Sequence, residues 1–152
     1  MALLTSLYLC SRTVYAAVGT PTGSGARVVS AAQTELPEGC LINGVITNEA
    51  DLTAALKEFF TANKLPMNRV ALIAGGSQFM HRILTLPAMS EKKRMAVLSH
   101  ELASGGAEVK APLDDYMLLS RDAKTRVDTV LATRVEQSVI AGYDALAKAV
   151  GF

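Results

Sequence analysis

The stretch LPEGCLINGVITNEADLTAALKEFF, residues 36–60, contains the transition on which the fold of this chain depends. Pro37 and Gly39 interrupt regular structure, and residues 40–47 form a short apolar connection. A helix is predicted from there, because Asn48 is a favoured N-cap and the residues that follow repeat at helical spacing: Leu52, Ala55, Leu56, Phe59 and Phe60. We therefore place a domain boundary between residues 47 and 48.

The residues before this stretch predict an antiparallel meander. Three segments are apolar or β-branched enough for strands: residues 3–9, 13–18 and 27–34. Ser11 and Arg12 can turn the first strand into the second, and the Gly-rich segment 19–25 predicts a flexible turn or loop. Residues 1–47 are thus predicted to be a first domain built on three strands.

The residues after residue 48 predict alternating helices and hairpins. Residues 70–74 are a continuous apolar run, and Gly75–Ser77 is interpreted as a hairpin turn into a strand over 79–86. A second helix over 90–103, a hairpin over 116–133 and a last helix from about residue 135 follow. Residues 48–152 are therefore predicted to form one αββαββα domain, and the fold class of the whole chain is α+β.

Composition argues against several function classes. The net charge is +1, Trp is absent and aromatic residues make up 5% of the chain, so neither a basic field nor a stacking platform for nucleic acid is expected. His81, His100 and the two cysteines have no partners at metal-ligand spacing. Adjacent carboxylates at Asp114 and Asp115 would point to opposite faces of a strand. We expect no metal site and no enzyme activity.

The charge cluster Glu91-Lys92-Lys93-Arg94 opens the second predicted helix. We interpret it as a solvated helix face. The alternative is a contact with an acidic partner or with lipid head groups, although three cations are too few to hold a membrane alone.

Several soft motifs, in order, resemble the PilM family of type IV pilus assembly, whose members have an actin-like fold. The matching segments are Leu36–Ile46 with the helix Leu52–Phe60, the segment Ser77–Ser90, Asp115-Tyr116, and Val127–Phe152. The resemblance implies the N-terminal β-meander of an actin-like lobe, followed by an αββαββα extra subdomain of the type shared with the cell-division protein FtsA.

The resemblance also implies a degenerate nucleotide site. Where the family has Asp-x-Gly-Ser/Thr, this chain has Tyr8, Leu9, Cys10 and Ser11. The carboxylate that positions Mg²⁺ and the glycine of the phosphate turn are both replaced. ATP and Mg²⁺, expected in the family, are therefore not expected as cofactors here.

The function that the resemblance implies is that of an adaptor. PilM-like proteins bind the cytoplasmic tail of a PilN-like membrane protein in a groove between the first lobe and the extra subdomain. The candidate peptide-binding residues are Ile42, Val45, Arg82 and Tyr116. Further partners would be pilus motor or platform proteins, and a homo-oligomer is expected. Such a protein would be cytoplasmic, at the inner face of the cell membrane, with only indirect membrane contact and no nucleic acid.

Two alternatives lead to different functions. The chain could be an FtsA-like protein or a type II secretion platform protein similar to GspL, in which the extra subdomain mediates self-association. It could also be a truncated actin-like ATPase. The substitutions at Tyr8 and Cys10 argue against the ATPase.

Overall fold

The computed structural model describes residues 3–105 and 108–152, which form two compact units. Unit 1 runs up to Ser77 and includes Ala141–Phe152, and unit 2 comprises Gln78–Ile140. Unit 2 is therefore inserted between two segments of unit 1.

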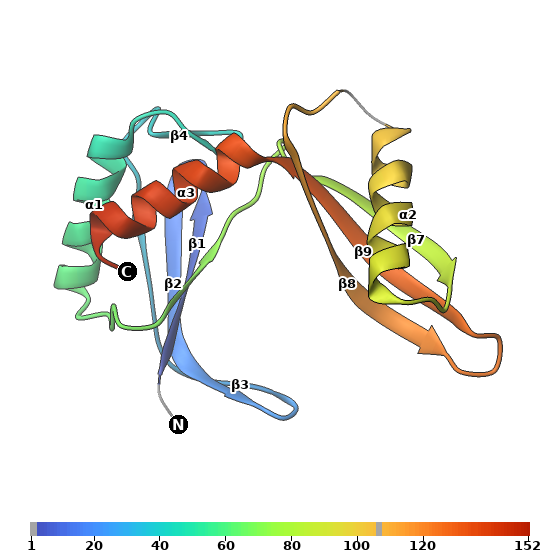
Figure 1. Cartoon of the computed structure of the whole chain (residues 1–152). Helices are drawn as coiled ribbons and strands as arrows, with labels where there is room; N and C mark the ends of the chain where they lie inside the picture. Colours follow the sequence, from blue (N-terminus) through green and yellow to red (C-terminus); the bar gives the residue numbers. More distant parts are fainter. Residues whose placement is uncertain (1–2, 106–107) are drawn as a thin grey trace. The chain divides into compact units, whose positions relative to one another are not determined.

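Unit 1 consists of a four-stranded sheet, a two-stranded ribbon and two helical segments (Figure 1). Its elements are β1 (Leu4–Cys10), β2 (Thr13–Thr22), β3 (Gly25–Glu35), β4 (Leu41–Ile42), β5 (Val45–Ile46), α1 (Glu49–Ala62), β6 (Val70–Ile73) and, past its first turn, α3 (Gln137–Val150). The predicted meander is confirmed. Of the turn or loop predicted over residues 19–25 only a tight turn at residues 23–24 remains, because β2 and β3 extend into this segment.

The sheet of unit 1 has the order β3-β2-β1-β6. β6 pairs in parallel with β1, opposite Leu7 and Tyr8 among others, and α1 lies between the two strands in the chain. The backbone nitrogen and hydroxyl of Thr5 donate to the carbonyl oxygens of Arg69 and Pro66, at 2.9 and 2.8 Å. The predicted hairpin around Gly75–Ser77 is therefore wrong: β6 closes one edge of the meander instead of pairing with the next strand.

The core of unit 1 lies on one face of this sheet, which α1 and α3 cover (Figure 1). The predicted start of α1 is confirmed, because the Asn48 side chain accepts a hydrogen bond from the Asp51 backbone nitrogen at 3.1 Å. The buried side chains are mostly aliphatic and aromatic: Leu7, Leu9, Val14, Ala16, Val18, Leu52, Leu56, Phe59, Phe60, Tyr143, Leu146 and Val150. Strand residues of alternate parity face the opposite side and remain accessible.

Unit 2 is a three-stranded antiparallel sheet with one helix on it (Figure 1). Its elements are β7 (Met80–Pro87), α2 (Glu91–Ala103), β8 (Pro112–Asp122) and β9 (Val127–Glu136), in the sheet order β7-β9-β8. Leu98 and Leu102 of α2 pack with Leu86, Val130 and Ala132 of the strands. The hairpin predicted over residues 116–133 is confirmed as β8 and β9, which are longer than expected.

The predicted division at residues 47/48 does not coincide with these units. α1, β6 and most of α3 complete the core of unit 1, as the ring contact between Phe60 and Phe152 illustrates, with centroids 4.8 Å apart. Unit 2 is accordingly a β-α-β-β unit and not the αββαββα domain that the linear order suggested. Mixed α+β architecture holds for the chain as a whole.

Candidate functional site

The predicted phosphate turn lies at the end of β1, beside a cavity of about 120 Å³. Its lining is uncharged: Tyr8, Leu9, Cys10, Ser11, Leu41, Asn43, Gly44, Gly75 and Gly76. A magnesium–phosphate group needs a carboxylate for the metal and cationic or backbone donors for the oxygens. Because this lining offers no carboxylate, it does not fit such a group. In the described part of the chain no cluster of three His, Cys, Asp or Glu is arranged for a metal ion.

Two glycines form the floor of this cavity by letting two backbone segments touch. Gly44 has φ +83° and Gly76 has φ +134°, in the region that disfavours side chains. A Cβ on Gly44 would collide with the backbone oxygen of Gly75, and one on Gly76 with the backbone of Asn43. The Tyr143 hydroxyl donates to the carbonyl oxygen of Gly44 at 2.9 Å, so α3 fixes the same segment from the core side. The turn Gly75–Gly76, which follows β6, therefore packs its backbone directly against the turn of the β4–β5 ribbon.

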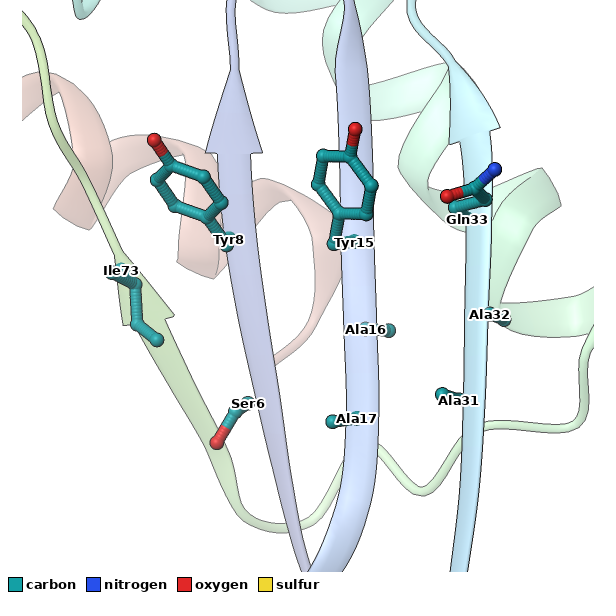
Figure 2. Close-up of a pocket in the computed structure, with 9 residues that line it drawn as sticks. All are labelled: Ser6, Tyr8, Tyr15, Ala16, Ala17, Ala31, Ala32, Gln33 and Ile73. Carbon is teal, nitrogen blue, oxygen red and sulfur yellow. The ribbon is translucent and has the colours of Figure 1, made fainter. Parts of the chain in front are cut away.

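A larger cavity of about 560 Å³ occupies the face of the unit 1 sheet opposite the helices (Figure 2). Tyr8 and Tyr15 lie side by side across β1 and β2, with ring centroids 6.3 Å apart. Next to them the floor is made of small residues in one row across three strands, Ser6, Ala17 and Ala31, and their strand neighbours Ala16 and Ala32 also border the cavity. Ile73 of β6 and Gln33 of β3 complete the lining. This surface has no charged group and is predominantly apolar.

The four peptide-binding candidates fall into two pairs. Ile42 and Val45 are opposite each other in the β4–β5 ribbon of unit 1, and Ile42 is 52% exposed. Arg82 and Tyr116 flank Ala132 from β7 and β8, on the face of the unit 2 sheet that α2 covers. The Arg82 guanidinium donates to the carbonyl oxygen of Glu101 at 2.6 Å, and the Tyr116 hydroxyl lies between Arg94 and Glu91. Arg82 and Tyr116 are thus engaged within unit 2, whereas Ile42 is free to contact a ligand.

Sequence reasoning missed the open face of unit 2. A cavity of about 380 Å³ lies there, lined by Phe79, Leu113, Asp114, Asp115, Thr133, Val135 and Ile140. Next to it Ile83, Leu131 and Met117 form a row across the three strands, with Ile83 and Met117 strongly exposed. The sequence does contain a sign of this face. Side chains alternate between the two faces of a strand, and in β7 the set that does not face α2 includes the large apolar residue Ile83.

An ionic network ties α2 to the sheet in unit 2. Buried Asp128 accepts hydrogen bonds from Arg94 at 2.6 Å and from Arg121 at 2.8 and 3.1 Å. Arg134 holds Asp114 at 2.7 and 2.8 Å. The Arg121 hydrogen bonds keep the pKa of Asp128 below its usual value, with the charges of Arg121 and Arg94 adding to the effect. The pKa of Asp114 is likewise lowered, chiefly by its hydrogen bonds from Arg134.

The interpretation of Glu91–Arg94 as a solvated face is wrong for its last member. Arg94 is buried, and its guanidinium contacts Asp128, Tyr116 and the Met89 carbonyl oxygen. Lys92 and Lys93 remain exposed. Arg94 is therefore unavailable to an external acidic partner or lipid head group.

The comparisons with known proteins give a fold likeness and no sequence match. No family model matches the chain, and no curated protein does. Among solved structures, the chain is similar to one in a PilM–PilN type IV pilus biogenesis complex, with a TM-score of 0.81 and 16% identical residues. The similarity covers 98% of this chain and 45% of that one. The chain thus has the fold of part of a PilM-type protein and spans less than half its length. No helix in the described residues is long and apolar enough to cross a membrane.

Proposed function

We propose that this PilM-like chain acts in type IV pilus assembly as an adaptor that binds the cytoplasmic tail of a PilN-like membrane protein. The observation that supports the proposal is the fold likeness to the PilM–PilN complex over nearly the whole chain. The surface of the chain also supports a role in binding other proteins, because each unit carries an open, mainly apolar cavity on its sheet. Apolar pockets beside strands are typical of domains that bind extended peptides.

Within unit 2 the tail peptide would dock in the cavity between Phe79 and Leu113. β8 is an edge strand there, so its outer backbone groups are available for strand addition. Leu113 is 40% exposed and gives a peptide side chain an apolar contact, and the carboxylate of Asp115 at the rim favours a basic neighbour. In unit 1, exposed Ile42 remains the candidate from the sequence.

Binding can be measured by fluorescence anisotropy with a labelled N-terminal peptide of a PilN-like protein. We expect saturable binding to the wild-type chain. Leu113→Asp should weaken it about tenfold or more, since roughly 1.4 kcal/mol of lost contact energy corresponds to a factor of ten. Ile42→Asp tests the contribution of the ribbon in the same way.

Val29→Asp provides the matched control, because Val29 is an exposed aliphatic residue of β3 that lines neither the unit 2 cavity nor the ribbon. It should bind as the wild type does. Absence of saturable binding by a folded sample contradicts the adaptor function. Binding that Leu113→Asp leaves unchanged contradicts only the docking place.

A further inference from the structure

The outer edge of β8 is regular over a short window. In the described part of the chain, β8 pairs with β9 on one side and with no strand on the other. Pro112 at its start has no backbone N–H to offer, and the register with β9 shifts between Leu118 and Ser120. Strand geometry suited to pairing with an added strand is therefore confined to residues 113–117.

One backbone donor of this window is already occupied by a side chain. The Tyr116 backbone N–H donates to the Asp115 carboxylate at 2.8 Å. In an antiparallel pair, successive residues turn their N–H and C=O groups alternately toward the partner strand and away from it. An N–H that bonds the side chain of its own neighbour is turned away from β9, so Asp115 covers a donor that an added strand would need. Charged side chains protect strand edges in this way.

Asp115 is also free to attract a cation. The lining of the adjacent cavity includes the carboxylates of Asp114 and Asp115. Asp114 is held by Arg134 through two hydrogen bonds, at 2.7 and 2.8 Å. Asp115 is exposed and takes part in none of the ion pairs among the described residues. A cation brought by a ligand would therefore meet Asp115 and not Asp114.

The side chains of the window determine which ligand chemistry fits along it. Leu113, Asp115 and Met117 lie on the open face of the sheet, because they alternate with Asp114 and Tyr116, which lie on the face that α2 covers. Leu113 and Met117 are 40% and 58% exposed. A strand added beside β8 places every second side chain on the same face. It matches this edge when those side chains are apolar, basic and apolar in turn.

We propose that the edge of β8 accepts extended peptides in which a basic residue has an apolar residue two positions away on each side, and that Asp115 selects them by exchanging partners. The basic side chain draws the carboxylate away from the Tyr116 N–H, and a backbone carbonyl oxygen of the peptide accepts that N–H instead. A peptide without a basic residue leaves the carboxylate in place and the donor covered. The inference rests on peptide docking at the unit 2 cavity, proposed above for the PilN-like tail, and adds the chemistry of the peptide and the residue that selects it.

Three synthetic peptides test the selection: Thr-Val-Thr-X-Thr-Val-Thr with Lys, Gln or Glu at X, each labelled for fluorescence anisotropy. The wild-type chain should bind the Lys peptide about two- to fivefold more tightly than the Gln peptide and on the order of tenfold more tightly than the Glu peptide, since cross-strand charges attract or repel by such factors. The preference should shrink in about 1 M salt. In hydrogen exchange followed by NMR, the Lys peptide should protect the Tyr116 amide.

Two substitutions separate the charge of Asp115 from its hydrogen bond. Asp115→Asn keeps an oxygen acceptor for the Tyr116 N–H but loses the charge, so it should bind all three peptides weakly and alike. Asp115→Ala also uncovers the donor, so it should bind the Gln peptide more tightly than the wild type does. Asp122→Asn is the matched control, because Asp122 is an exposed carboxylate of the same strand that accepts backbone N–H groups outside the cavity. It should select as the wild type does.

Equal affinity of the wild type for the three peptides, or a Lys preference that persists in Asp115→Asn, would overturn the proposal. A folded wild-type chain that does not bind the Lys peptide would also overturn it, and would leave Asp115 as a residue that only protects the edge. If Asp115→Ala aggregates through its uncovered edge, the Asn variant still decides. The three peptides contain no PilN sequence. Selective binding of the Lys peptide without binding of the PilN-like tail would therefore contradict the adaptor function and leave this inference standing.

Discussion

At the scale of single residues, Phe59 and Phe60 show how α1 contributes to unit 1. Both are nearly inaccessible, and their rings meet edge to face with centroids 6.1 Å apart. Phe60 also contacts Phe152, so the helix and the end of the chain share one cluster.

Replacing Phe59 by alanine should cost about 3–5 kcal/mol in the free energy of unfolding, because it leaves a cavity in a packed core. Glu58→Ala is the matched control, since Glu58 is exposed on the same helix. Like Lys92→Ala on α2, it should change stability by no more than about 0.5 kcal/mol. Urea denaturation followed by circular dichroism measures all three. Equal losses for Phe59→Ala and Glu58→Ala would mean that the assigned helix face is wrong.

Gly44 is required for a different reason, the close approach of two backbones. Gly44→Ala should destabilise the chain by more than the roughly 1–2 kcal/mol that a left-handed conformation costs an L-residue, because a backbone collision is added. Gly23→Ala, in the β2–β3 turn with open space around it, should have a small effect. Thermal unfolding compares the two variants, and a larger shift for Gly23→Ala would contradict this account.

At the scale of elements, α2 is held to its sheet by side-chain ion pairs as well as by the packing of Leu98 and Leu102. The pairs Arg94–Asp128 and Arg134–Asp114 lie under the helix, where removal of one partner would leave a buried charge uncompensated. The burial of Arg94 is not fully compensated either, because its Nε has no hydrogen-bond partner. The network thus fixes the position of α2 on β8 and β9.

This network makes the stability of unit 2 depend on acid pH. The pKa of Asp128 is lower in the folded chain than in the unfolded chain, where it is about 3.9. Ionised Asp128 therefore stabilises the folded state fully above a pH of about 3.9, and this stabilisation is lost as the pH falls through the lower pKa of the folded state. The urea midpoint should therefore drop as pH falls below about 4. Asp128→Asn should be less stable than the wild type at neutral pH and should lose less on acidification. The variant should still lose some stability in acid, because the pKa of Asp114 is lowered too. If the urea midpoints of the variant and the wild type change identically with pH, Asp128 is not a source of the acid dependence.

At the scale of the whole molecule, unit 2 is an insertion whose two ends meet. Met80 at the start of β7 is paired with Arg134 near the end of β9, so the chain leaves and re-enters unit 1 through neighbouring strands. The inserted unit contributes its own core and its own open face without interrupting the sheet of unit 1.

Mg-ATP should not raise the melting temperature of the whole chain. A ligand at about 100 times its dissociation constant stabilises the native state by roughly 2.7 kcal/mol, which raises the melting temperature of a chain of this size by roughly 5–10 °C. The cavity at Tyr8–Ser11 lacks a carboxylate for Mg²⁺, so no such shift is expected. Differential scanning fluorimetry with and without Mg²⁺ checks this. A magnesium-dependent rise would favour the actin-like ATPase alternative.

The sequence by itself determined the local elements and one apolar face for most of them. Strand and helix periods depend only on spacing along the chain, so they can be recognised from residues close together in the sequence. This applies to the alternation in β1 and β2, the cap at Asn48 and the apolar stripe Leu52–Phe60. That residues 8–11 contain neither a carboxylate nor a glycine is likewise read from the sequence alone, since it depends only on which side chains are present.

Only the tertiary structure decided which elements pair. Backbone hydrogen bonds are nearly the same for every residue, so the apolar run in β6 indicated a strand but not that its partner would be β1 in place of β7. The environment of Arg94 depended on Asp128, which lies on a different element, 34 residues further along the chain. The open faces at Tyr15 and Ile83 likewise became visible only when the helices were seen to cover one side of each sheet. Pairing and burial are properties of residues distant in sequence, and local periodicity carries no information about them.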